Sequence, residues 1–420
     1  MQFSSLVMIV ALTMLNLGLI WLLLAIPLGA RTVTRTMHTS AARGRVWSAL
    51  YPFGANASWN GTIISSELEP GTQKFGKIRI SYDDRYGEPI ERKVCLEELT
   101  PEVSYRLRIV DDTTLDPAFW QHYHERVSIA ETDTGCAVTV SETDRYRGFA
   151  FLGFRYFKIR RQLLGLKIWA ESGKYRDIGM FERPLTQVGM AFISAMILWP
   201  FFGLTPTGLI LSSMLTLVVA MHEFGHMFAF RLMGHKSARM IFIPILGGIA
   251  LGGRPYDRHF EVGFSALLGA GFSVFPVMAA ISFYPVAVSH GWNGLAACLA
   301  AFGMIGAVFN LANLVPVWKF DGGQVIRQVF TNKWAQALSS FVLLGALLMI
   351  GMLAGFSVSV LLPVGVVFAL MSLMTNGPSF KPRHALKPMT GRERAAILAG
   401  LAATFIAHAS GTIWGLAQFS

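Results

Sequence analysis

The chain has 420 residues, of which 53% are hydrophobic and 15% charged, and its mean hydropathy is +0.47. Soluble globular proteins carry about 25% charged residues, so this composition excludes disordered, collagen-like and coiled-coil chains and predicts a protein that lies mostly in lipid. The net charge of +11 fits Lys and Arg in cytoplasmic loops, and nucleic acid is not expected as a partner. The three cysteines, Cys95, Cys136 and Cys298, are too scattered for a disulfide framework or a cysteine zinc site.

Apolar segments long enough to cross a bilayer recur along the chain. About 17–25 mainly apolar residues span the hydrocarbon as a helix. Eight such segments are expected, near 4–29, 185–204, 207–233, 262–288, 293–315, 335–354, 358–375 and 394–416. The first lacks the basic start of a cleaved signal peptide, so a retained anchor is expected. The segments predict a multi-pass α-helical membrane protein.

The stretch between the first two spans differs in composition from the rest. Residues 31–183 hold most of the acidic residues and short alternating segments such as KIRISYDD and CAVTVSET, followed by the amphipathic segment RYFKIRRQLLGLKIWAES. Alternation is typical of strands, so an inserted α+β domain with strands first and a long helix last is predicted. We therefore expect an anchor at 1–30, a soluble domain at 31–183, a membrane core at 184–390 and a C-terminal span at 391–420.

The Lys and Arg distribution predicts the orientation. Cations cluster from Arg31 to Arg45 and from Arg155 to Arg183, whereas the connection FFGLTPTG has no charge. Because cytoplasmic loops carry the excess of Lys and Arg, the soluble domain is expected in the cytoplasm. The compact loops favour a bacterial inner (plasma) membrane as the location.

The third span contains a metal-site motif. His222-Glu223-Phe224-Gly225-His226 matches H-E-x-x-H, which places two imidazoles one turn apart on one helical face with a carboxylate beside them. Ionisable side chains are costly in a bilayer and usually serve a function there. A polar cluster that only holds helices together is the structural alternative.

A catalytic zinc has three protein ligands, so one more is needed. The candidates downstream of His226 are Asp257, Glu261, Asp321, Glu393, His235, His259, His290, His384 and His408. Asp321 follows Pro316, which breaks the fifth span so that the chain can turn inward, at a depth similar to that of the motif. Asp321 is therefore the favoured third ligand.

HEFGH in one span and N-x-x-P-x-x-x-x-D-G about 90 residues later together resemble the site-2 protease family of intramembrane zinc metalloproteases. The resemblance covers residues 185–390. It implies that His222, His226 and Asp321 bind Zn²⁺, that Glu223 activates water, and that Asn313 positions or polarises the substrate.

Two further segments bear on the same resemblance. The stretch ARMIFIPILGGIALGGRP is similar to the family's membrane-associated hairpin, which can present an edge to an extended substrate, and a packing loop is the alternative. Gly269-Ala270-Gly271-Phe272-Ser273 departs from the family's usual Gly-Pro-x-x-Asn pattern. That departure affects the expected helix packing and leaves the expected ligands unchanged.

The soluble domain resembles the START-like, polyketide-cyclase-type helix-grip fold in element order and in the positions of Trp47, Trp59 and Trp120. These aromatics line either a plain core or a site for an apolar ligand. His122 and His124 would share one face of a strand, either as a metal pair or as solvated residues. The helix bearing Arg160 and Arg161 either faces water or lies against anionic lipid.

The sequence thus predicts a zinc metalloendopeptidase in the membrane, with a soluble regulatory domain. Expected substrates are single-pass membrane proteins, cleaved near the cytoplasmic boundary. One alternative is a non-proteolytic sensor or lipid-binding protein that retains a structural zinc site, although such a site needs no base like Glu223. A transporter is the second alternative, and it would show internal repeats or paired broken helices, which the sequence lacks.

Overall fold

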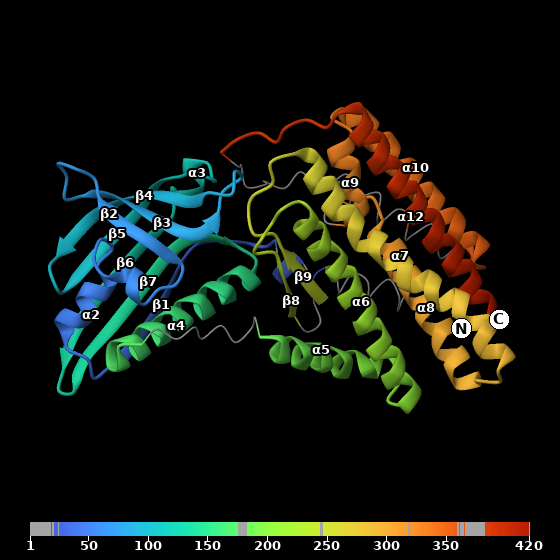
Figure 1. Cartoon of the computed structure of the whole chain (residues 1–420), viewed down its shortest axis with the longest axis horizontal. Coiled ribbons are helices and arrows are strands. Elements are labelled where there is room, and N and C mark those ends of the chain that lie inside the picture. Colours follow the sequence, from blue (N-terminus) through green and yellow to red (C-terminus); the bar gives the residue numbers. More distant parts are fainter. Residues whose placement is uncertain are drawn as a thin grey trace. The chain divides into compact units, whose positions relative to one another are not determined.

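A computed structural model describes residues 25–174, 183–243, 247–317, 320–358 and 383–419, together with residues 18, 21–23, 361 and 365. The chain forms two compact units, Met1–Gly179 with Ser379–Ala385, and Met180–Pro378 with Leu386–Ser420 (Figure 1). Most of the expected spans near 4–29 and 358–375 lies outside the described residues.

The first unit is an antiparallel sheet with one long helix. Its elements are β1 (Pro27–Thr39), α2 (Arg43–Leu50), η1 (Asn56–Ser58), β2 (Ile63–Leu68), β3 (Phe75–Asp83), β4 (Pro89–Thr100), β5 (Ser104–Asp112), α3 (Pro117–Trp120), β6 (His124–Thr132), β7 (Gly135–Arg147) and α4 (Phe149–Ser172). The strand order is β1-β7-β6-β5-β4-β3-β2, so each strand pairs with its neighbour in sequence except β1, which pairs with β7. The expected order, strands first and a long helix last, agrees with this structure.

Helix α4 covers one face of the sheet (Figure 1), and alternating side chains of the strands are buried on that face. Along β7, Cys136, Val138 and Val140 are buried and alternate with more exposed residues. On α4, Ile159, Leu163, Leu166 and Ala170 are buried, and their spacing of three or four residues places them on one side of the helix. Fully burying an aliphatic side chain of this size contributes about 1.5–3 kcal/mol.

The aromatic residues singled out from the sequence belong to this core. Trp59 and Trp120 are buried in it, and Trp47 packs against it. The indole N–H of Trp59 donates to the carbonyl oxygen of Ala49 at 2.7 Å, which ties η1 to α2. These three side chains therefore fill the interior between the sheet and the helices.

The second unit is mainly helical. Its elements are α5 (Pro184–Leu198), η2 (Trp199–Phe202), α6 (Pro206–Leu232), β8 (Arg239–Ile243), β9 (Gly247–Leu251), α7 (His259–Ser289), α8 (Asn293–Asn313), α9 (Asp321–Val329), α10 (Lys333–Leu353) and α12 (Gly391–Ala417).

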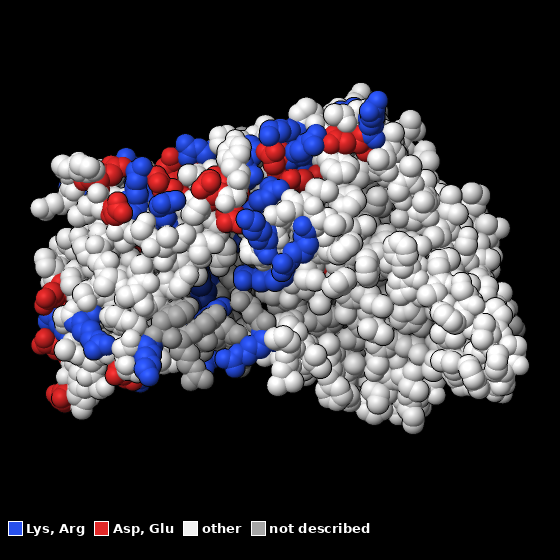
Figure 2. All heavy atoms as spheres, viewed as in Figure 1, with Lys and Arg blue, Asp and Glu red and all other residues white. Residues whose placement is uncertain are grey.

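Six helical segments of this unit, among the described residues, are long and apolar enough to cross a membrane. They are Pro184–Phe202, Pro206–Leu232, His259–Ser289, Asn293–Asn313, Lys333–Leu353 and Gly391–Ala417, and they match the other six expected spans. In Figure 2 the surface along these helices is almost entirely white, and the charged side chains gather at one end of them. This distribution suits helices whose middle sections face hydrocarbon.

Close contacts between α6 and α7 bring the histidine motif against α7. A Cβ atom on Gly225 would lie 2.3 Å from the carbonyl oxygen of Leu268, and one on Gly269 would lie 2.4 Å from Cε1 of His226. Only glycine fits at such a close approach. The Gly269 segment therefore packs directly on the histidine-bearing helix.

Candidate metal centre

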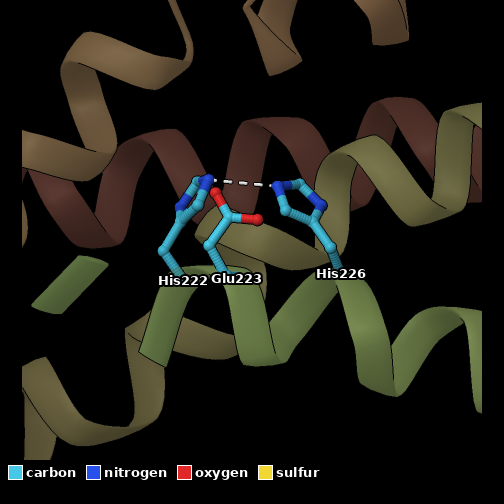
Figure 3. Close-up of side chains that lie close together, drawn as sticks. All are labelled: His222, Glu223 and His226. Atoms are coloured by element: carbon cyan, nitrogen blue, oxygen red, sulfur yellow. Dashed lines mark hydrogen bonds between the residues drawn. The ribbon is translucent and has the colours of Figure 1, made fainter. Parts of the chain in front are cut away.

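Helix α6 positions His222, Glu223 and His226. It begins at Pro206, with the Thr205 side chain accepting a hydrogen bond from the Gly208 amide, and it runs without an internal proline to Leu232. One helical turn separates the two imidazoles, so they project from the same side of the helix (Figure 3). Their Nε2 atoms are 3.1 Å apart.

Asp321 joins the pair from α9. Its Oδ2 lies 3.1 Å from Nε2 of His222 and 3.4 Å from Nε2 of His226. The chain turns sharply between α8 and α9 because Gly322 packs onto the backbone of Leu314, where a Cβ would lie 1.9 Å from the carbonyl oxygen. The structure thus brings together the three residues for which a shared metal was predicted.

Other candidates for the third ligand have partners elsewhere in the second unit. Glu261 pairs with Arg254 at 2.8 Å, Asp257 with Lys387 at 2.9 Å and Glu393 with Arg258 at 2.9 Å. These pairs leave Asp321 as the downstream carboxylate beside the two imidazoles within the described part of the chain.

A hydrogen bond at Nδ1 of each imidazole determines which of its two ring nitrogens is protonated. Nδ1 of His222 lies 2.8 Å from Oδ1 of Asn310, whose Nδ2 donates to the carbonyl oxygen of Gly306 at 2.7 Å. Because the Asn310 oxygen accepts, Nδ1 of His222 is the protonated nitrogen. Nδ1 of His226 likewise donates to the Ser265 carbonyl oxygen at 2.7 Å. In the neutral rings, each Nε2 therefore carries a lone pair.

This donor set fits a divalent metal ion. Three electron-pair donors, Nε2 of His222, Nε2 of His226 and Oδ2 of Asp321, lie 3.1–3.4 Å from one another. Oδ2 of Asp321 is buried and has no hydrogen-bond donor among the described residues. Lone pairs at this distance repel one another unless a cation lies between them, and imidazole and carboxylate ligands suit Zn²⁺.

Glu223 lies beside this donor set and contacts the β8–β9 hairpin. Its Oε2 accepts a hydrogen bond from the Ala250 amide at 3.2 Å. A Cβ on Gly248 would lie 2.3 Å from Cγ of Glu223, so the close approach of β9 requires glycine there. His222, Glu223 and His226 each offer a ligand atom within 4.8 Å of the others. The β9 contact holds the carboxylate next to the imidazoles.

Asn313 and Asn310 have different surroundings. Nδ2 of Asn313 donates to the Phe309 carbonyl oxygen at 3.0 Å within α8, and in the described part of the chain no hydrogen bond joins it to the histidines or Asp321. Asn310, one turn earlier, bonds His222 and was missed by the sequence reasoning. Its signal was an amide side chain within an otherwise apolar span.

A second cluster of ionisable groups lies inside the first unit. Glu142 is 1% exposed and accepts hydrogen bonds from Arg155 at 2.6 Å and from Lys158 at 3.2 Å. Glu125 accepts from the hydroxyls of Tyr105 at 3.1 Å and Tyr123 at 3.2 Å. Burial, with Glu142 close by, raises the pKa of Glu125. The interior of this unit is thus polar at one end.

The two histidines noted in the first unit do not share a strand. His122 precedes β6 and its Nε2 lies 2.8 Å from Nε2 of Gln121, whereas His124 begins β6 and its Nδ1 lies 3.6 Å from Oε2 of Glu97. Their side chains therefore have separate neighbours.

Similarity to known proteins is limited. No family model matches the chain. The zinc metalloprotease MJ0392 of Methanocaldococcus jannaschii is 24% identical over 155 residues, which cover 36% of this chain and 41% of that protein. The match thus spans less than half of this relative. It links the chain to a named zinc metalloprotease at low identity.

Solved structures align with about a third of the chain. Protein MLL2253 from Mesorhizobium loti is 16% identical, covers 33% of this chain and 94% of its own, and has a TM-score of 0.26. A START superfamily protein from Mycobacterium smegmatis is 12% identical, covers 32% of this chain and 94% of its own, and has a TM-score of 0.25.

Proposed function

We propose that this protein is an intramembrane zinc metalloprotease of the site-2 type. The observation that carries the proposal is the convergence of Nε2 of His222, Nε2 of His226 and Oδ2 of Asp321 between apolar helices, with Glu223 beside them. The low-identity similarity to a zinc metalloprotease supports the same chemistry.

In this proposal His222, His226 and Asp321 hold the metal. Zinc bound there would lower the pKa of a water molecule to about 7 and polarise a peptide carbonyl. Asn310 and the Ser265 carbonyl oxygen fix the rings so that both Nε2 lone pairs point to the site. Such outer hydrogen bonds keep metal-binding histidines in the correct tautomer.

Glu223 is the proposed general base. Its carboxylate would take a proton from the attacking water and pass it to the nitrogen of the leaving amine. The Ala250 amide donates to one of its oxygens, which holds the carboxylate beside the imidazoles. Asn313 is proposed to contact the substrate carbonyl, a role for which its side chain would have to leave the Phe309 carbonyl oxygen.

The proposed substrate is an unwound segment of a single-pass membrane protein. A peptide bond inside a transmembrane helix is shielded and hydrogen-bonded, so a cleavable segment must first become extended. The β8–β9 hairpin lies against Glu223 and could pair with such a segment through main-chain hydrogen bonds. Cleavage is expected near the cytoplasmic boundary.

For the first unit, we propose a START-like helix-grip fold that senses a signal from the cytoplasm. The basic segments at 31–45 and 155–183 support this orientation, and a bacterial inner membrane is the proposed location. We also propose an apolar ligand for this unit, which would bind in the interior away from Glu142 and Glu125.

The test is metal content and cleavage, measured together on the full chain in detergent. Wild type is expected to hold about one zinc per chain and to cut a generic transmembrane substrate. Asp321→Ala is expected to lose the metal, whereas Glu223→Gln is expected to keep it and lose cleavage. Full zinc retention in Asp321→Ala would remove that residue from the ligands. A zinc-loaded wild type that cuts nothing would favour a sensor with a structural zinc.

A further inference from the structure

Helix α4 carries exposed aromatic side chains on the side turned away from the core. Phe154 is 70% exposed and Phe157 50%, and Leu164 is also exposed. With about 100° of rotation per residue, these three residues fall opposite Ile159, Leu163 and Leu166, which are buried. The outer face of α4, defined here as Phe154, Phe157, Arg161 and Leu164, with Phe151 and Arg160 at its flanks, therefore lies outside the core.

The cations between Arg155 and Arg161 divide between the interior and this outer face, while Lys167 pairs with Glu171. Arg155 and Lys158 reach inward to the buried Glu142, whereas Arg160 and Arg161 are exposed. The single acidic residue of the helix, Glu171, lies near its end and accepts from Thr39 and from the Ser40 amide. The outer face of α4 thus combines aromatic rings with positive charge.

Strand β1 adds cations next to the helix. Arg35 stacks over the ring of Tyr156, with its guanidinium carbon 3.8 Å from the ring centroid, and Arg31 is exposed two residues from the buried Val33. Aromatic rings interleaved with arginines are typical of helices that lie in the headgroup region of anionic membranes.

The connection between α4 and the first described candidate span is short. Helix α4 ends at Ser172, and the first described candidate span begins at Pro184. Each connecting residue can extend at most about 3.6 Å, so residues 173–183 hold the end of α4 within about 40 Å of the start of α5. A lipid surface is therefore within reach of the outer face.

We propose that the outer face of α4 lies on the anionic surface of the bilayer that the helical unit crosses. Phe154 and Phe157 would insert at the level of the headgroups, and Arg160 and Arg161 would pair with lipid phosphates. This contact would fix one side of the first unit to the membrane and leave the sheet facing water. The proposal rests on the membrane-spanning helices and is independent of protease activity.

The test places a spin label on α4 in the full chain. Phe154→Cys carries the nitroxide, in a background in which the half-buried Cys298 is replaced by alanine and the buried Cys95 and Cys136 are kept. The protein is reconstituted in phosphatidylcholine vesicles and in an equal mixture of phosphatidylcholine and phosphatidylglycerol. Tyr86→Cys, a 71% exposed position in the β3–β4 turn, is the matched control.

The label on Phe154→Cys is expected to collide with oxygen in preference to a water-soluble nickel chelate in the mixed vesicles. Adding R160E and R161E should abolish that preference, and the Tyr86→Cys label should collide mainly with the chelate in both vesicles. A Phe154→Cys label that is open to the chelate in both vesicles would overturn the proposal in favour of a solvated face. A label shielded from both reagents would overturn it in favour of protein contact.

Discussion

Asn310 and His222 are joined across two helices by a hydrogen bond of 2.8 Å between Oδ1 and Nδ1. The bond sets which nitrogen of the imidazole is protonated, and so leaves Nε2 facing Asp321 at 3.1 Å. Removing a partner of this kind commonly costs about 10–100-fold in metal affinity.

Asn310→Ala is therefore expected to weaken zinc binding by about 10–100-fold, as measured by competition with a chromogenic chelator. Asn310→Asp keeps an acceptor oxygen and should bind zinc more tightly than Asn310→Ala. Asn313→Ala is the matched control because its amide bonds the Phe309 carbonyl oxygen within the same helix. Equal zinc affinity in the Asn310→Ala and Asn313→Ala proteins would show that Asn310 does not orient the ring.

Gly269→Ala is expected to disrupt the metal centre directly. The added methyl would lie 2.4 Å from Cε1 and 2.5 Å from Nε2 of His226, so the ring or α7 must move. Overpacking of this kind typically costs about 1–3 kcal/mol, and zinc affinity should fall with it. Thermal unfolding in detergent measures the loss of stability, and the zinc retained during dialysis against a chelator measures the loss of affinity.

Gly271→Ala provides the control in the same helix. Its methyl would first meet Oγ1 of Thr404 at 3.6 Å, which is an ordinary contact distance. This variant should keep both its metal and its unfolding temperature. If Gly271→Ala loses as much zinc as Gly269→Ala, the loss reflects a general effect of added volume on the packing of α7 and not the approach to His226.

Glu125 should make the stability of the first unit fall as the pH rises. Burial, and then the charge of Glu142, raise its pKa, while Lys158 and hydrogen bonds from Tyr105 and Tyr123 oppose the rise. The folded-state pKa of Glu125 lies above its unfolded-state value. The contribution of Glu125 to the free energy of unfolding is therefore complete when the pH lies below the usual pKa of a glutamate. It is lost as the pH rises through the folded-state pKa.

Glu125→Gln removes this titration and should flatten the pH profile. Amide hydrogen exchange of the β6 and β7 segments, corrected for the intrinsic effect of pH on exchange, measures the local opening free energy. Protection in wild type should decrease above the ordinary glutamate pKa, and the variant should keep its protection. Parallel profiles for the two proteins would mean that Glu125 titrates alike in the folded and unfolded states.

The sequence predicted those parts of the site that depend on local geometry. His222, Glu223 and His226 are placed by one helix of 3.6 residues per turn, so their spacing alone predicts a shared face. Asp321 was predicted because Pro316 ends a span and turns the chain. Asn310 was not predicted, because its contact with His222 depends on how α8 packs against α6, and a single sequence carries no measure of that packing.

The same limit applies to the helix contacts around the site. Gly225 lies inside the HEFGH motif, but the sequence does not show which segment packs against it. In the structure the partner is the backbone of α7 at Leu268, and Gly269 of the same helix faces the imidazoles. Periodicity also predicted the buried stripe on α4, whereas the polar pair Glu125 and Glu142 emerges only when β6 and β7 are paired in register.

His408 of α12 is expected to stabilise the metal centre without touching the metal ligands. It is fully buried, and its Nε2 donates to the Ala270 carbonyl oxygen at 2.9 Å. Ala270 follows Gly269, which packs on His226 and His222, so this bond holds the C-terminal span against the segment of α7 behind the imidazoles. His408→Ala would lose the bond and leave a cavity, and large-to-small changes in a core typically cost about 2–5 kcal/mol.

His408→Ala should therefore lower the unfolding temperature of the zinc-loaded protein and speed the loss of zinc to a chelator. His290→Ala is the control, because Nδ1 of His290 also donates to a backbone carbonyl, that of Val286 at 2.9 Å, but on an exposed side chain at the end of α7. An exposed bond of this type competes with water and contributes little. Equal effects of the two substitutions would mean that the contact between α12 and α7 does not support the site.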